Sequence, residues 1–209
     1  HGSFFDLFTP FTLFCGVLSL LMHVTHGAAL LAWRVVDPVA DRARKLGIIT
    51  AVLVAALFAL GGVWVAGLDG HVVTSAIDTA GPSNPLTKTV SVVEGAWLHN
   101  FTTWSWMWAA PALGVIAALA VSLFLVMRRP IAAFLASALS ITGVILTVGF
   151  ALFPFVLPSS VNPNQGLTAW DSSSSHLTLW VMLIATIIFL PIVLSYTSSV
   201  YHVIHIGGV

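Results

Sequence analysis

The chain has 209 residues, of which 58% are hydrophobic and only 7% are charged, and its formal net charge is zero. A soluble globular domain is about 45–50% apolar and about 25% charged, so too few charges are present to cover a water-exposed surface. The high hydrophobicity also excludes disorder, and the neutral balance leaves no basic face for nucleic acid. The single cysteine, Cys15, excludes a disulfide framework, a Cys-based zinc site and a Cys-ligated iron–sulfur cluster. Composition therefore predicts an all-α membrane protein.

Five stretches are long and apolar enough to cross a bilayer, whose hydrocarbon core of about 30 Å needs about 20 residues of helix. The predicted polytopic transmembrane bundle has its spans at residues 8–33, 46–68, 104–127, 131–153 and 177–201. Two long loops, residues 69–103 and 154–176, connect the second span to the third and the fourth to the fifth. The opening residues carry no basic region and no small-residue cleavage site, so we expect no signal peptide there.

Basic residues predict the orientation of these spans. Short loops that carry Arg and Lys face the cytoplasm. We therefore expect the C-terminus inside, and the loops 69–103 and 154–176 outside together with the N-terminus of this chain. Lys88, in the first outer loop, is the exception to the pattern. The residues that set the pattern lie between spans one and two or between spans three and four: Arg34, Arg42, Arg44, Lys45, Arg128 and Arg129.

The fifth span carries recognisable helix signals. Asp171 and the serines at 172–175 precede it and could supply N-cap oxygens. Pro191 lies within it and should kink it, because proline removes a backbone hydrogen bond. Four glycines in the second and fourth spans could allow close approach between helices: Gly61, Gly62, Gly143 and Gly149.

The first outer loop is predicted to contain an interfacial helix over residues 88–99. Glu94 would lie on this helix, either as an exposed acid, which we favour, or as a proton donor. The apolar residues that recur there at roughly helical spacing are Val90, Val93, Trp97 and Leu98.

His23 and His26 are the ionisable residues placed deep within a predicted span. Three residues apart, they share a helix face, and an ionisable group in a membrane is a functional candidate, here as a haem ligand or a proton relay. The alternative, which we favour, is hydrogen bonding between helices. A bis-His haem needs ligands at one depth on two helices, and His202 lies nearer the cytoplasm than His26.

A second group of histidines could meet at the outer surface. His99 precedes the third span and His176 precedes the fifth, and His71 could join them to hold a haem or a metal. No HExxH pattern supports a metal, so surface or capping roles are the favoured interpretation. We predict no catalytic residue and no metal site in this chain, and we assign no cofactor-binding residue.

Several segments, taken in order, resemble subunit II of the bd-type quinol oxidases. The match covers nearly the whole chain and looks like the C-terminal five-helix portion of that subunit, with further helices expected ahead of His1. The segments that carry the resemblance are residues 58–65 (FALGGVWV), 68–73 (LDGHVV), 83–88 (SNPLTK), 95–101 (GAWLHNF), 111–115 (PALGV), 153–160 (FPFVLPSS), 167–171 (LTAWD) and 174–179 (SSHLTL).

The resemblance implies a non-haem subunit of a terminal oxidase in the bacterial inner (plasma) membrane. That enzyme oxidises quinol near the outer face, reduces dioxygen to water and generates a proton gradient. The resemblance places haem b, haem d and the quinol-binding loop in subunit I, the expected partner. It also implies contacts with membrane lipid and quinol, and allows a small accessory subunit. A family member has glutamine where this chain has His26, which counts against His26 as an obligatory haem ligand.

Two other functions stay open at this point. A haem b-binding membrane anchor that transfers electrons to quinone would use His23, His26, His99 or His176 as ligands. A transporter half would need intramembrane charges and broken helices in corresponding positions, and the sequence offers neither.

Overall fold

The computed structural model describes residue 5, residues 8–77, residue 81 and residues 83–207, and it describes side chains as far as Tyr201. The side chain of His202, considered above as a haem ligand, lies outside the described residues. Within the described part, five helical segments are long and apolar enough to cross a membrane. The chain is therefore a multi-pass membrane protein, as its composition predicted.

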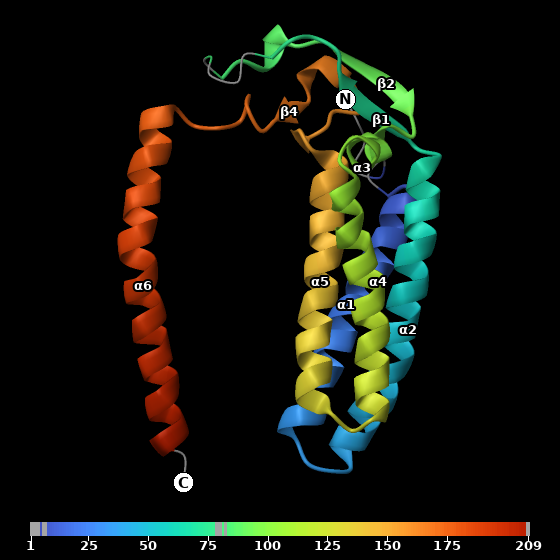
Figure 1. Cartoon of the computed structure of the whole chain (residues 1–209), viewed down its shortest axis with the longest axis vertical. Coiled ribbons are helices and arrows are strands. Elements are labelled where there is room, and N and C mark those ends of the chain that lie inside the picture. The colour runs from blue at the N-terminus through green and yellow to red at the C-terminus, as the bar shows by residue number, and fades with distance from the viewer. Residues whose placement is uncertain (1–4, 6–7, 78–80, 82, 208–209) are drawn as a thin grey trace.

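Four helices form the body of the molecule: α1 (Pro10–Arg34), α2 (Val39–Ala66), α4 (Ala109–Val126) and α5 (Pro130–Leu152). They pack in a closed ring, with α1 against α2, α2 against α4, α4 against α5 and α5 against α1. A fifth long helix, α6 (His176–Gly207), stands to one side of this bundle (Figure 1). The ring of four helices therefore forms without α6.

The helices approach one another through small side chains. A lipid environment offers no hydrophobic driving force for helix association, so close backbone contact and hydroxyl hydrogen bonds hold the helices together. A Cβ added to Gly143 would lie 2.8 Å from the Cα of Gly114, and one added to Gly61 would lie 3.0 Å from the Phe14 ring. The larger buried cluster consists mainly of alanine: Ala29, Ala32, Ala51, Val121, Leu125, Ala133 and Ala136.

The expectation of close approach at four glycines is therefore confirmed for two of them. Gly62 and Gly149 have open space, with nothing within 4 Å of an added Cβ. Periodicity predicts which residues are small, but it does not say which small residue faces a neighbour.

The helix that contains the second predicted span begins before the start of that span. Helix α2 starts at Val39 rather than at residue 46, so Arg42, Arg44 and Lys45 lie in its first two turns. Asp41 in the first turn forms an ion pair with Arg44 one turn further along, and an acid near a helix N-terminus is favourable. These basic residues therefore lie on the helix instead of in a loop.

The two long loops contain short secondary structure at one end of the bundle (Figure 1). Strand β1 (Asp69–Val73) pairs antiparallel with β2 (Val90–Glu94), and β3 (Phe155–Leu157) pairs antiparallel with β4 (Leu167–Thr168). The remaining elements are helix α3 (His99–Thr103) and the 3-10 turns Pro85–Thr87, Ala96–Leu98, Ser105–Trp108 and Pro163–Gln165.

The predicted interfacial helix over residues 88–99 is wrong, because β2 occupies residues 90–94 and a 3-10 turn occupies residues 96–98. Valine is β-branched and favours strands, and β1 supplies a partner whose Val73 lies opposite Val90. Gly95 then adopts a left-handed conformation with φ of 71°, which ends the strand. Glu94 is an exposed residue at the end of β2, not on a helix.

The predicted N-cap of the fifth span is confirmed at Ser175 and wrong at Asp171. Helix α6 begins at His176, and the backbone N–H of Thr178 donates to Ser175 Oγ at 3.4 Å. Asp171 is five residues too early to cap the helix, and its carboxylate is engaged elsewhere. The helix continues through Pro191.

The two ends of the molecule differ in charge. The connections between α1 and α2 and between α4 and α5 lie at one end with the last turn of α6, and both sheets lie at the other (Figure 1). This arrangement agrees with the predicted alternation of loops. The side of the membrane on which each end lies remains a prediction.

Replacing Gly143 with alanine should destabilise the bundle, because the added methyl group meets the backbone of Gly114 on α4. Overpacking of this kind costs about 1–3 kcal/mol. Gly149→Ala is the matched control on the same helix, where the methyl group meets nothing, and it should be neutral or slightly stabilising. Steric trapping in bicelles would measure both unfolding free energies, and equal losses would contradict the packing described.

Candidate functional site

The two histidines of α1 bind different partners. His23 is exposed, and its Nδ1 lies 2.7 Å from the carbonyl oxygen of Ser19. His26 is half-buried, its Nδ1 lies 2.7 Å from Ser137 Oγ on α5, and its ring stacks on Phe134 with 4.6 Å between centroids. The imidazole of His26 thus joins two helices, which is the role that the sequence analysis favoured.

Other hydroxyl groups cross the bundle near His26. Thr25 Oγ1 on α1 lies 2.8 Å from Thr50 Oγ1 on α2, and Ser140 Oγ on α5 donates to the carbonyl oxygen of Gly114 at 2.9 Å. All three hydroxyl residues are buried. These bonds tie α1 to α2 and α4 to α5 at points where the neighbouring side chains are too small to interlock.

The outer histidines divide between two places. His71 and His99 line one cavity of about 360 Å³, together with Asn100, Phe153 and Trp170. His71 Nε2 donates to the carbonyl oxygen of Ser159 at 3.1 Å, and its Nδ1 is the buried side-chain polar atom that lacks a partner among the described residues. His176 instead faces Trp180 on its own helix, with 6.4 Å between ring centroids.

No metal centre emerges from these positions in the part of the chain that the structure describes. Within it, no three His, Cys, Asp or Glu side chains are grouped so as to hold an ion. His71 and His99 share a cavity without a third such ligand beside them. The outer loops therefore bring two of the three predicted residues together and leave His176 apart.

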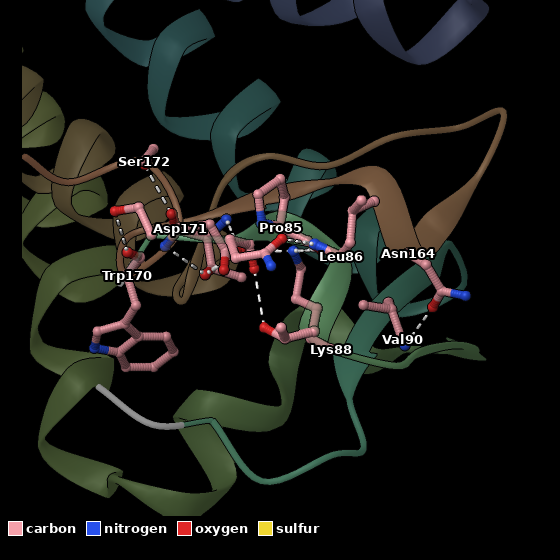
Figure 2. A network of polar contacts seen from close by, with 12 residues as sticks. Pro85, Leu86, Lys88, Val90, Asn164, Trp170, Asp171 and Ser172 are labelled. Atoms are coloured by element: carbon pink, nitrogen blue, oxygen red, sulfur yellow. Dashed lines mark hydrogen bonds and ion pairs between the residues drawn. The ribbon is translucent and has the colours of Figure 1, made fainter. Parts of the chain in front are cut away.

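A polar clamp, defined here as Lys88, Asp171 and Thr168, joins the two outer loops. Figure 2 shows Lys88 and Asp171 within this network of polar contacts. Lys88 Nζ donates to Asp171 Oδ2 at 2.6 Å and to the carbonyl oxygen of Pro85 at 3.0 Å. Thr168 donates to the same Oδ2 through Oγ1 at 2.6 Å and through its backbone N–H at 3.1 Å. The side chains of Lys88 and Asp171 are only 1% and 7% exposed.

The role of the clamp is to hold the two outer loops in place, because both of its charges are buried and neutralise each other. Burial alone would raise the pKa of the Asp171 carboxyl, but the hydrogen bonds from Lys88 and Thr168 and the attraction of the ammonium outweigh it and hold the pKa below its usual value. The ammonium of Lys88 is likewise occupied. Neither group is available as a base or as an anion site.

Further hydrogen bonds between the same loops strengthen this junction. The backbone N–H of Val90 donates to Asn164 Oδ1 at 2.7 Å (Figure 2), and Ser83 Oγ donates to the carbonyl oxygen of Ser173 at 2.7 Å. Asn100 donates to the carbonyl oxygens of Phe150 and Phe153 at the end of α5. Together these bonds hold in place the outer loop that precedes α6.

Sequence reasoning missed the clamp, although one signal pointed to it. Lys88 is the one basic residue outside the two basic connections, and a lysine needs an acidic partner if it is buried. Which acid it meets depends on the fold, because Asp171 is 83 positions away.

Two apolar cavities lie in the half of the bundle nearest the sheets. One of about 380 Å³ opens between α1, α2 and α5, and another of about 430 Å³ opens beside α2 and α4. Hydrocarbon or aromatic groups are what such walls accommodate. The residues common to both are Phe58, Gly62, Leu98, Phe101 and Thr147.

Lys88→Met should destabilise the outer loops by about 3–5 kcal/mol, because it leaves the Asp171 carboxylate buried without its partner. The control is Arg44→Met, which breaks a pair in which the Asp41 side chain is 44% exposed and should cost about 0–1 kcal/mol. Limited proteolysis of the outer loops in nanodiscs would compare the two variants. Equal susceptibility would contradict an energetic role for the clamp.

The clamp should also make the outer loops acid-sensitive. The pKa of Asp171 is lower in the folded chain than its ordinary value of about 3.9, so the stabilisation is complete above that value and is lost as the pH falls through the folded value. Thermal unfolding followed from about pH 7 to about pH 3 should show a smaller dependence on pH in the double variant Lys88→Met/Asp171→Leu. An unchanged dependence would assign the acid sensitivity to other groups.

Comparison with known proteins agrees with the resemblance noted above. The protein family described as "Cytochrome bd terminal oxidase subunit II" matches residues 1–204. The chain is 48% identical over 200 residues to "Probable cytochrome oxidase subunit 2" of Haemophilus influenzae and 45% identical over 201 residues to "Cytochrome bd-I ubiquinol oxidase subunit 2" of Escherichia coli. Each match covers 96% of this chain and 53% of the relative, so the chain spans about half the length of the curated relatives it matches. The chain belongs to the cytochrome bd terminal oxidase subunit II family.

Proposed function

We propose that this chain acts as part of the non-haem subunit of a bd-type quinol oxidase in the bacterial inner membrane. The complex oxidises quinol, passes the electrons to dioxygen to form water, and generates a proton gradient. The family match across residues 1–204 carries this proposal. Haem b and haem d belong to the partner, subunit I, and the C-terminus of this chain lies in the cytoplasm, in keeping with the basic connections at that end.

The exposure of α6 supports a scaffold role. From Leu177 to Tyr201 its side chains are exposed, apart from half-buried Ala185, and the span has high mean hydropathy. A transmembrane helix of this kind packs against apolar neighbours, and the other described residues of this chain leave it uncovered. The clamp fixes the loop above α6, so this helix offers subunit I an apolar surface at a defined position.

The two apolar cavities support a second part of the proposal. Their walls are hydrocarbon and aromatic, and Phe58 and Phe101 line both. The isoprenoid tail of a quinol or the acyl chain of a lipid fits such walls. We assign these cavities to hydrocarbon chains rather than to the site where quinol is oxidised, because their lining offers few polar groups to receive protons.

The first test is purification of the native complex, followed by separation of this chain from its partners. Reduced-minus-oxidised spectra should show haem b and haem d in the complex and no Soret band in the isolated chain. His26→Leu should leave the haem content of the complex unchanged. A Soret band in the isolated chain that is lost in His26→Leu would instead favour the alternative, a haem b-binding anchor that transfers electrons to quinone.

A further inference from the structure

A small cavity lies inside the four-helix ring, and side chains from all four helices line it. Its volume is about 10 Å³, which is about the space that one water molecule requires. Ser140, on its wall, lies 10 residues after Pro130, or about 15 Å along the 23-residue helix α5. The cavity is therefore remote from both ends of the bundle. The residues that line it are Met22, Thr25, Val54, Ala118, Val121, Ser137, Ser140 and Ile141.

Three of the lining side chains carry hydroxyl groups, and each is more than nine-tenths buried. The exposed fractions of Thr25, Ser137 and Ser140 are 4%, 2% and 4%. A buried hydroxyl group is costly unless it is hydrogen-bonded. The other lining residues are apolar, so they donate no hydrogen bond to these oxygens.

The two serines of α5 donate their hydrogens to the protein and keep acceptor capacity. Ser140 Oγ donates to the carbonyl oxygen of Gly114 at 2.9 Å and receives no hydrogen bond from the described residues. Ser137 Oγ donates to the carbonyl oxygen of Phe134 at 2.7 Å, and its other partner is Nδ1 of His26 at 2.7 Å. A hydroxyl oxygen has two lone pairs. Both lone pairs of Ser140 and at least one of Ser137 are therefore unused within the described chain.

Thr25 on α1 also keeps acceptor capacity. Its Oγ1 lies 2.8 Å from the carbonyl oxygen of Leu21 and 2.8 Å from Thr50 Oγ1, and it has one hydrogen for the two. Whichever of them receives that hydrogen, at least one lone pair of Thr25 Oγ1 is unused. The three hydroxyl oxygens on the cavity wall therefore share one need, which is a hydrogen-bond donor.

We propose that this cavity binds one water molecule, which donates hydrogen bonds to two of the hydroxyl oxygens of Thr25, Ser137 and Ser140. Water is neutral and has two hydrogens to donate. A buried water typically makes about three hydrogen bonds, and Thr25 can supply the third by donating to the water oxygen instead of to Leu21. The site thus satisfies both the water and the hydroxyl groups.

Other small occupants do not fit these walls. A metal cation would be buried without a compensating charge, because no described carboxylate lines the cavity, and such a burial is costly. Dioxygen has no hydrogen to donate, so it would leave the hydroxyl lone pairs without partners. The chemistry of the wall therefore selects water.

The water connects two hydrogen-bonded pairs that are otherwise separate. His26 with Ser137 joins α1 to α5, and Thr25 with Thr50 joins α1 to α2. Ser140 brings α4 into the same network, because it donates to a carbonyl oxygen of that helix. All four helices are then joined by hydrogen bonds at a depth where lipid supplies none. This inference concerns the bundle and does not rest on the proposed function.

A density map of the complete complex in nanodiscs tests the site. At a resolution that shows ordered water, a peak should lie within hydrogen-bond distance of at least two of the three hydroxyl oxygens. The double variant Ser137→Ala/Ser140→Ala should lose the peak. Thr142→Val removes an exposed hydroxyl from the same helix and should keep it. No peak in the unmodified complex, or a peak that persists in the double variant, would overturn the proposal.

A second measurement uses the unmodified complex, so it does not depend on whether a variant folds. With ¹³C-labelled serine and threonine and deuterated lipid, solid-state NMR should show magnetisation passing from water protons to Cβ of Ser137 and Ser140. Thr142, exposed on α5, is the internal control and should receive less at the same mixing time. No transfer to either serine would overturn the proposal. A complex with normal haem spectra that fails this test would leave the proposed function standing.

Discussion

The absence of water from the bilayer core is the constraint on which this structure depends. Every backbone polar group in the spans must be satisfied within its own helix, and helices gain little from hiding apolar side chains from an apolar solvent. The bundle therefore relies on alanine and glycine at its contacts and on hydroxyl bonds such as Thr25 to Thr50.

Outside the membrane, different forces act on the same chain. The outer loops are held by a buried ion pair and by hydrogen bonds between segments far apart in sequence, including Lys88 with Asp171 and Val90 with Asn164. An ion pair of this kind contributes position more than net stability, because desolvation of both charges offsets much of their attraction. Its effect is to hold the two outer loops together at the end of the bundle where the sheets lie.

Much of the architecture could be predicted from the sequence, because transmembrane helices are specified locally. Length and hydropathy predict the five helices that are long and apolar enough to cross a membrane, and the end of α5 at Leu152 agrees with the proline that follows. The errors occurred where tertiary pairing decides the outcome. Residues 90–94 have a spacing compatible with a helix, but β1 offers them a strand partner. Asp171 was predicted to cap a helix, but its carboxylate instead pairs with Lys88 from the other outer loop. The sequence analysis favoured a hydrogen bond from His26 to another helix. It could not identify Ser137 as the partner, because that choice depends on how α1 and α5 are rotated about their axes.

The enclosure of Lys88 has a practical consequence for following assembly of this protein. The chain has two lysines, Lys45 near the start of α2 and Lys88 in the outer loops, and they lie at opposite ends of the bundle. Lys45 is exposed, whereas the Lys88 side chain is buried between the two outer loops. Acylating reagents that attack free amines would modify the first freely and reach the second only after the loops separate. The chain thus carries an internal reporter, in which acylation at one lysine measures opening of the extramembrane cap and acylation at the other calibrates the reagent.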